Sequence, residues 1–167
     1  MTVRPFQIGD LRSILRIEGA SFDQEAWTED IFVDCFRDER TLFLIAAIEG
    51  RTAGYIIARF GRHGAEIDSL AVLPRYRRQG VAIQLLKTAM QRVRRAGVEA
   101  VWLTVQSKNL SAISLYRKFG FVRTRTIPGY YANNSSGWRM RNHPRPKPSR
   151  FPLPVRKRTS PAPRSTS

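Results

Sequence analysis

The chain has 167 residues, of which 42% are hydrophobic, so it can bury one sizeable core and we expect one domain. No apolar run approaches the roughly 18 residues that a membrane span needs. The first ten residues, MTVRPFQIGD, contain no apolar signal-peptide segment. These features exclude a membrane-spanning protein and predict a mature cytoplasmic one.

Cysteine and histidine usage argues against disulfide, thiol and metal chemistry. Cys35 is the only cysteine, so no internal disulfide can form and we expect a reducing compartment. Helical spacing places it near Phe32 and Phe36, which predicts a buried small hydrophobe rather than a nucleophile. Its two possible partners, His63 and His143, lie in a turn-like GRHG and a Pro-rich segment. No metal-ligand spacing is present, and we predict no metal site.

The net charge of +16 suggests contact with nucleic acid, but the charge is unevenly distributed. Residues 139–167 contain nine Lys or Arg and no acid, which leaves +7 for the rest of the chain. Residues 143–167 are also rich in Pro and Ser. We therefore predict a folded domain over residues 1–142 and a disordered basic tail over residues 143–167, able to make a weak contact with ribosomes or RNA.

The first half of the chain predicts two helices and three strands. A short strand over residues 2–6 precedes Asp10, which caps a helix with Leu11, Ile14, Leu15 and Ile17 on one face. Thr28, followed by two acids, begins a second helix. Residues 41–60 form two apolar strands joined by a turn at Glu49, Gly50 and Arg51. Residues 65–73 form a further strand, which ends in an apolar run typical of burial on both faces.

The second half alternates helices and strands. Residues 81–97 form a helix with an apolar stripe and a glycine stop, and residues 98–106 form a buried strand. A short helix over residues 109–120 follows. Residues 121–127 and 137–141 then form two strands on either side of a polar loop. This order predicts an α/β fold with a mixed sheet.

The stretch RYRRQGVA, residues 75–82, lies between the apolar strand and the long helix. At such a junction several backbone N–H groups lack helical partners, and the helix dipole favours an anion. Gly80 lets the backbone approach a ligand, Ala82 keeps the first turn thin, and Arg77 and Arg78 add donors. The stretch is neither a P-loop nor a dinucleotide-binding fingerprint. On its own it could also be a solvated basic loop.

The surrounding residues favour a phosphate-binding loop. Arg77-x-x-Gly80-x-Ala82 fits the R/Q-x-x-G-x-G/A signature of the GNAT superfamily of acetyl-CoA-dependent N-acetyltransferases, whose loop holds the CoA pyrophosphate. The following WLTVQSKNLSAISLYRKFGF and the YY of GYYAN resemble the protein N-terminal acetyltransferases, among them the bacterial ribosomal-protein-alanine enzymes. The resemblance covers residues 3–141. It implies a GNAT fold, a mixed and mostly antiparallel sheet with splayed central parallel strands flanked by helices, and acetyl-CoA as co-substrate.

The resemblance also implies roles for individual residues. Tyr116 matches the tyrosine that protonates the departing CoA thiolate, and Asn109 matches an asparagine near the pantetheine arm. Trp27, Tyr130 and Tyr131 fall where the acceptor substrate is bound. The positions implied to bind acetyl-CoA through the strand end and the loop are Leu70, Ala71, Val72, Arg77, Arg78, Gln79, Gly80, Val81 and Ala82. Unpaired groups at the strand end can bind the pantetheine amides as an added strand would. From the sequence alone, Tyr116 could also be a core aromatic.

The general base departs from the family pattern. Thr104 lies in LTV, where the ribosomal enzymes have a sequence that resembles LEV and some eukaryotic relatives one that resembles LHV. Threonine cannot act as a base at neutral pH. Strand alternation places Glu66 and Asp68 on one face of the preceding strand, and Glu66 matches a glutamate common there. We predict that Glu66 is the base. Alternatively, Glu66 is a solvated acid at the start of the strand, or Glu25 is the general base.

These observations predict an acetyltransferase that transfers acetyl to a protein N-terminal α-amino group by direct attack in a ternary complex. An α-amine with a pKa of ~7.7–8.0 is partly neutral in the cell, whereas lysine near ~10.4 is almost entirely protonated. A site without its strongest base therefore suits the α-amine. The alternatives are a small-molecule amine, such as a polyamine or aminoglycoside, and a non-catalytic protein that binds acyl-CoA or RNA.

Overall fold

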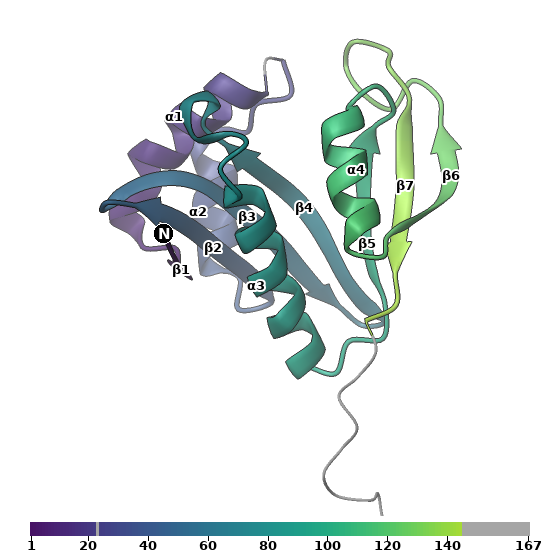
Figure 1. Ribbon diagram of the computed structural model, residues 1–167, viewed down its shortest axis with the longest axis horizontal. Coiled ribbons are helices and arrows are strands. Elements are labelled where there is room, and N and C mark those ends of the chain that lie inside the picture. The colour runs from purple at the N-terminus through teal and green to yellow at the C-terminus, as the bar shows by residue number, and fades with distance from the viewer. Residues whose placement is uncertain (23, 145–167) are drawn as a thin grey trace, which may run out of the picture.

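A computed structural model describes residues 1–22 and 24–144. One seven-stranded sheet carries helices on both of its faces (Figure 1). The strands are β1 (Thr2–Pro5), β2 (Thr41–Ile48), β3 (Arg51–Gly61), β4 (Gly64–Val72), β5 (Val101–Gln106), β6 (Val122–Ile127) and β7 (Gly137–Asn142). The helices are α1 (Leu11–Ser21), α2 (Glu29–Arg37), α3 (Val81–Arg95) and α4 (Leu110–Lys118), with single 3-10 turns η1 (Ile8–Asp10) and η2 (Pro74–Tyr76).

The sheet has the order β1-β2-β3-β4-β5-β7-β6, and the predicted mixed sheet is confirmed. β4 and β5 are its one parallel pair among the described residues, and every other pair is antiparallel. The parallel ladder is short. It joins only Ala65, Glu66 and Ile67 of β4 to Val101–Leu103 of β5. Beyond this point β4 and β5 diverge, and Figure 1 shows them spread apart.

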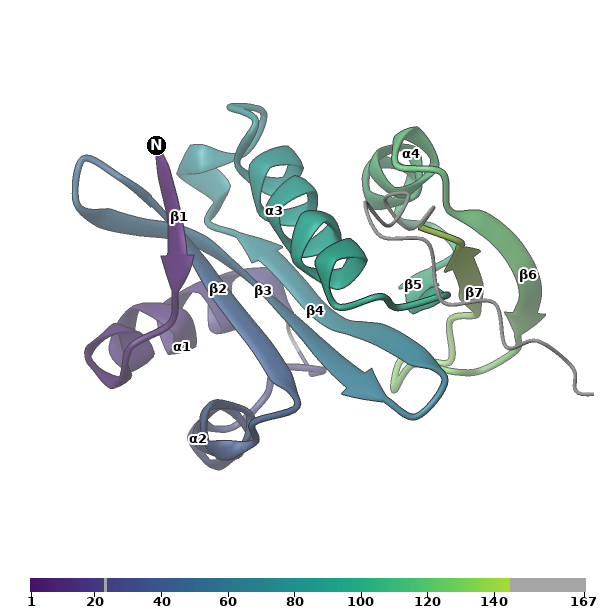
Figure 2. The same ribbon diagram turned by 90° about the horizontal axis from the view of Figure 1, so that it is seen from below.

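Two hydrophobic cores lie on opposite faces of the sheet. α3 packs on one face, and α1 and α2 pack on the other (Figure 2). The predicted apolar stripe of α3 is buried in the first core: Val81, Leu85, Ala89 and Val93. The second core surrounds Phe32, Phe43 and Tyr55 and includes Ile14 and Ile17 of α1. Burial of both faces explains why the end of β4 is continuously apolar.

A β-bulge in β4 controls which side chains face the candidate site. Ile57 pairs with Ser69, whereas Ala58 pairs with Ile67, so Asp68 is an extra residue in the ladder. A bulge of this kind reverses the alternation of side chains along the strand. Ile67 accordingly belongs to the α3 core, whereas Ala71 belongs to the core under α1 and α2.

The N-terminal cap predicted for the first helix differs in one respect. Asp10 precedes α1, but its carboxylate makes no capping hydrogen bond to that helix. It accepts two bonds of 2.8 Å from the Arg4 guanidinium and one of 2.9 Å from Gln7 N–H. The Asp10 carboxylate oxygens therefore accept from Arg4 and Gln7, and not from the free N–H groups at the start of α1.

The strand predicted over residues 137–141 is present as β7. Arg139 and Arg141 lie on it, so seven of the nine cations of residues 139–167 fall in the predicted tail. Pro144 is buried, and residues 145–167 of the predicted tail lie outside the described residues. None of the helices in residues 1–22 and 24–144 has the length and apolar character to cross a membrane.

Candidate active site

The loop between β4 and α3 is built around two left-handed backbone conformations. Arg78 has φ +63° and Gly80 has φ +79°, and Gly80 is the N-cap of α3. The first helical hydrogen bond runs from Gln84 N–H to Gly80 C=O at 3.0 Å. The N–H groups of the preceding helical residues therefore have no acceptor within the helix. Turns of this kind form a concave set of N–H donors that favours an anion.

The side chains of the loop both brace it and add positive charge. Arg77 Nε donates to Val72 C=O at 3.0 Å, and Gln79 Nε2 donates to Arg75 C=O at 2.8 Å. Arg78 is exposed. A Cβ added at Gly80 would meet no atom within 4 Å, so the space over the loop is open. The loop therefore fits a phosphate group in both charge and shape.

The separation of β4 from β5 leaves an edge of β4 next to this loop. Leu70, Ala71 and Val72 pair with β3, but among the described residues they have no partner strand on the β5 side. Ala71 and Val72 are buried, and Leu70 is half-buried. An extended chain of amides could add to this edge as a strand does.

α4 supplies a buried phenol on the other side of the opening. Asn109 caps the helix by accepting a hydrogen bond of 3.1 Å from Ala112 N–H. Tyr116 is 7% exposed and packs edge-on against Phe121. Burial, and then the neighbouring Tyr131, raise the pKa of Tyr116, so its hydroxyl keeps its proton at neutral pH. A protonated phenol can donate to a thiolate, whose conjugate thiol has a pKa of about 8.5.

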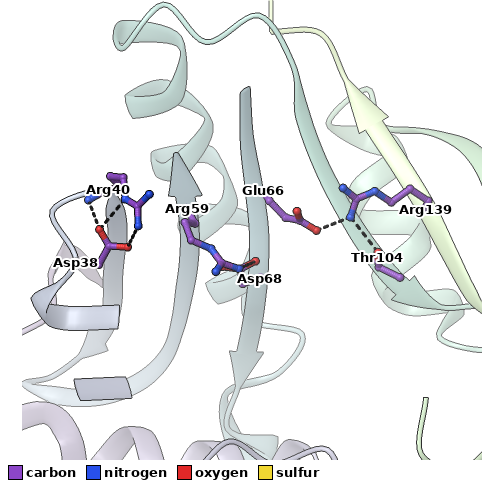
Figure 3. Close-up of polar contacts among 7 residues, drawn as sticks. All are labelled: Asp38, Arg40, Arg59, Glu66, Asp68, Thr104 and Arg139. Carbon is purple, nitrogen blue, oxygen red and sulfur yellow. Dashed lines mark hydrogen bonds and ion pairs between the residues drawn. The ribbon is translucent and has the colours of Figure 1, made fainter. Parts of the chain in front are cut away.

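Glu66, Thr104 and Arg139 form one polar group across three neighbouring strands (Figure 3). Arg139 Nη1 on β7 donates to Glu66 on β4 and to Thr104 Oγ1 on β5, the latter at 3.2 Å. Glu66 remains partly accessible, with 41% of its side chain exposed. The sequence analysis gave Arg139 no role in the site, because only the β5–β7 register places it opposite Thr104.

Asp68 lies in a different ion pair. It pairs with Arg59 at 2.9 Å, and only 11% of its side chain is exposed (Figure 3). Burial raises the pKa of Asp68, while Arg59 opposes that change. The two carboxylates share one face of β4, as alternation predicted, but each pairs with a different arginine.

Two loops meet beside this polar group. Glu25, between α1 and α2, accepts a hydrogen bond from Ala132 N–H in the β6–β7 loop. The rings of Tyr130 and Tyr131 in the same loop pack edge to face, with their centroids 5.0 Å apart. A Cβ at Gly137 would lie 2.9 Å from Thr104 Cγ2 and 3.2 Å from Tyr130 Cβ, so these side chains close around the glycine. The β6–β7 loop is therefore anchored next to Thr104.

Burial and Glu25 make the phenol of Tyr131 less acidic. Burial, then Tyr130 and Glu25, raise the pKa of Tyr131 to about 12. Tyr131 also contributes to the raised pKa of Tyr116, so the predicted acid and one of the predicted acceptor-binding tyrosines lie within electrostatic range of each other.

A buried network that the sequence analysis did not identify supports the α1–α2 loop. Glu18 on α1 is 2% exposed and accepts hydrogen bonds from Tyr55 and, at 2.8 Å, from Trp27 N–H. Ser69 on the bulged strand lies 2.9 Å from the Tyr55 hydroxyl. Burial raises the pKa of Glu18, while the bonds from Tyr55 and Trp27 oppose that change. The network fixes the loop that carries Trp27 relative to β4.

The remaining candidates for metal or thiol chemistry stay apart from the site. The described residues contain no group of three His, Cys, Asp or Glu side chains that could hold a metal ion. Burial raises the pKa of Cys35, which keeps it a protonated thiol in a half-buried position on α2. The described residues thus combine a basic loop at a helix N-terminus, a splayed parallel pair of strands and a protonated phenol, an arrangement suited to acyl transfer.

Comparisons with known proteins agree with this chemistry. The profile of the Acetyltransferase (GNAT) family matches residues 9–121. An N-alpha-acetyltransferase of Saccharolobus solfataricus is 28% identical over 153 residues, covering 83% of this chain and 90% of that protein. The chain belongs to the acetyltransferase (GNAT) family and is an acetyl-CoA-dependent N-acetyltransferase.

Two solved structures show the same GNAT fold. The ribosomal-protein-S18-alanine N-acetyltransferase from Escherichia coli has a TM-score of 0.81 at 25% identity, covering 91% of this chain and 99% of that one. Ard1 from Thermoplasma volcanium has a TM-score of 0.79 at 32% identity, covering 85% and 96%. The predicted GNAT fold is confirmed.

Proposed function

We propose that this enzyme acetylates the N-terminal α-amino group of a protein, in the cytoplasm. The observation that carries this proposal is the contact of Arg139 with both Glu66 and Thr104. The Glu66 carboxylate is held by an arginine, and the strand position next to it offers only a hydroxyl. Such a site suits an amine that is already partly neutral. An α-amine with a pKa of ~7.7–8.0 meets this condition, whereas lysine near ~10.4 does not.

The two joined loops support a peptide acceptor. Glu25 connects the α1–α2 loop to the β6–β7 loop, and Trp27, Tyr130 and Tyr131 lie on these loops. Aromatic side chains on two fixed loops can position the first residues of an extended peptide. Two relatives in the comparisons are named as an N-alpha-acetyltransferase and a ribosomal-protein-S18-alanine N-acetyltransferase, which favours the same acceptor class.

In this proposal the backbone and loop residues bind the acetyl donor. The edge of β4 at Leu70, Ala71 and Val72, with Asn109, accommodates the pantetheine amides. The pyrophosphate lies on the loop residues Arg77, Arg78, Gln79, Gly80, Val81 and Ala82. The N–H groups at the start of α3 and the exposed Arg78 supply the positive potential.

The proton transfers fall to two side chains. Glu66 removes a proton from the amine, directly or through a water, so that the nitrogen can attack the acetyl carbonyl carbon. The C–S bond then breaks, and Tyr116 gives its proton to the sulfur. The raised pKa of Tyr116 keeps that proton available at neutral pH. No covalent enzyme intermediate is required, because the amine attacks the thioester itself.

A peptide N-terminus library incubated with the enzyme and acetyl-CoA tests the acceptor. Mass spectrometry should find acetyl on α-amines, and parallel peptides with a blocked N-terminus and one lysine should remain unmodified. The Tyr116→Phe variant serves as the control for uncatalysed transfer. Faster acetylation of a polyamine or an aminoglycoside than of every peptide would replace this proposal with the small-amine alternative.

A further inference from the structure

Charge is strongly polarised along the chain. Residues 1–68 contain eight Lys or Arg and twelve of the thirteen acids. Residues 69–144 contain fourteen Lys or Arg and a single acid, Glu99. The first part is therefore acidic overall, whereas α3, β5, α4, β6 and β7 form a strongly basic part. The cofactor loop accounts for only a few of these cations.

Several of the other cations gather at the far end of α3 and α4. This group, which we name the α4–β6 basic surface, consists of Arg117 and Lys118 in the last turn of α4, Arg123 on β6, and Arg94, Arg141 and His143, which line one hollow. Arg94 lies in the last turn of α3, about 20 Å along the helix from Gly80 at 1.5 Å per residue. Within residues 1–22 and 24–144, no carboxylate pairs with any member of the group.

The guanidinium groups of two of these arginines lie over one aromatic ring. The guanidinium carbon of Arg123 lies 4.6 Å from the centroid of the Trp138 ring, and that of Arg117 lies 5.7 Å from it. Both arginines are exposed. A guanidinium that is already ordered loses less conformational entropy when it binds, and its outer face can stack on a planar ring. Arg141 lies over Trp102 at 5.3 Å on the other face of the sheet, because Met140, the preceding residue of β7, is the one opposite Arg123.

A hollow adjoins these arginines. Its volume is about 600 Å³, and Arg94, Phe119, Val122, Arg141, Asn142 and His143 line it. Val122 is 62% exposed, so the floor offers apolar surface. Asn142 is only 6% exposed and donates to Phe119 C=O at 2.8 Å, but its Oδ1 has no hydrogen-bond partner among the described residues. The hollow thus combines cations and apolar contact area.

We propose that the α4–β6 basic surface binds single-stranded RNA. Phosphates fit the dispersed cations, and unstacked bases fit the guanidinium planes and the apolar floor. An acidic polypeptide would satisfy the cations but has no regular series of planar rings to stack on them. The sequence after Pro144 contains seven more Lys or Arg and no acid, so the chain remains basic beyond His143.

Protection of a sheet edge does not account for the surface. β6 is an edge strand, and charged residues there prevent pairing with another chain. That role requires only Arg123 and its neighbours on β6. Arg94 on α3 and Arg117 on α4 lie outside the edge strand, and neither blocks a backbone donor or acceptor of β6.

The test compares two full-length triple variants with equal loss of charge. Arg94→Gln, Arg117→Gln and Arg123→Gln alter the basic surface. Arg12→Gln, Arg16→Gln and Arg51→Gln alter exposed arginines on α1 and β3 and serve as the matched control. Binding to a labelled oligouridine is measured by fluorescence anisotropy at several salt concentrations. Acetylation of a short peptide should be normal for both variants, because neither touches the proposed acetyl-transfer site.

We expect the surface variant to bind RNA at least about tenfold more weakly than the control at low salt. For this variant, the slope of log affinity against log salt concentration should be less steep by about 2. Each lost phosphate contact on a single strand contributes ~0.7 to that slope. Equal weakening in the two variants would reduce the effect to net charge and overturn the proposal. Displacement of the RNA by polyglutamate as effectively as by unlabelled RNA would assign the surface to acidic polypeptides instead.

Discussion

The loop proposed to bind the cofactor takes its groups from one short stretch of chain, whereas the proposed acceptor side draws on segments up to 107 residues apart. The loop acts mainly through backbone N–H groups that the left-handed conformations at Arg78 and Gly80 present. The acceptor side acts through side chains, and each depends on a partner from another element: Glu66 on Arg139, Glu25 on Ala132 and Glu18 on Tyr55. A backbone site tolerates changes of side chain that keep its conformation. A side-chain site is sensitive to each partner.

Among the side chains of the proposed site, removal of the Tyr116 hydroxyl should have the largest effect on turnover. Tyr116→Phe should lower turnover by roughly 10²–10⁴-fold, because no other group then protonates the leaving sulfur. Stability should change little, since the ring still packs on Phe121 and the described residues provide no hydrogen bond to the hydroxyl. Turnover is measured as thiol release, and folding as thermal melting by circular dichroism.

Tyr131→Phe is the matched control, because it removes a neighbouring phenol. It should affect turnover much less than the change at Tyr116. If Tyr116→Phe retained near-normal turnover, Tyr116 would be a core residue only.

A charge placed on the cofactor loop tests the backbone half. Gly80→Asp should weaken acetyl-CoA binding by about 100-fold, equivalent to ~2.8 kcal/mol, because a carboxylate would lie where the pyrophosphate must approach. Calorimetry measures the affinity. Gly80→Asn is the control, since it shares the shape and the tolerance of positive φ but carries no charge. The cofactor assignment fails if a folded Gly80→Asp variant binds acetyl-CoA normally.

The two carboxylates of β4 distinguish a reacting group from a structural pair. Glu66→Gln should lower turnover by about tenfold at pH 7, and Asp68→Asn should lower it less. The deficit of Glu66→Gln should shrink as the pH rises through ~7.7–8.0, because the α-amine then loses its proton without help. Thr104→Glu, which restores a carboxylate beside Arg139, should raise the rate. Equal and pH-independent effects of the two β4 variants would exclude Glu66 as the base.

The smallest effect on chemistry is expected from the end of the chain. Deletion of residues 145–167 should leave turnover on a short peptide unchanged, because every residue assigned to the site precedes them. The cut follows Pro144, which is buried. Association with ribosomes at low salt should fall, since seven cations that can contact phosphate are removed. Loss of peptide acetylation would mean that these residues belong to the folded domain or the site.

The sequence alone predicted the parts of this protein that local order controls. Hydrophobic periodicity predicted the helices and strands, and a glycine after three cations at the start of an amphipathic helix indicated the loop that we propose to bind phosphate. These features depend on residues that are close together in the chain, so the sequence alone can reveal them. The predicted α/β fold and the family followed from them.

Only the tertiary structure decided how the acceptor side is assembled. The bulge at Asp68 changes which residues of β4 share a face, and the β5–β7 register places Arg139 opposite Thr104. The sequence placed Arg139 on a strand and placed Glu66 and Asp68 on one face of another strand, but it did not indicate that Arg139 would pair with Glu66 and Arg59 with Asp68. Periodicity cannot reveal these points, because register and bulges are set by hydrogen bonds between strands that are distant in the chain.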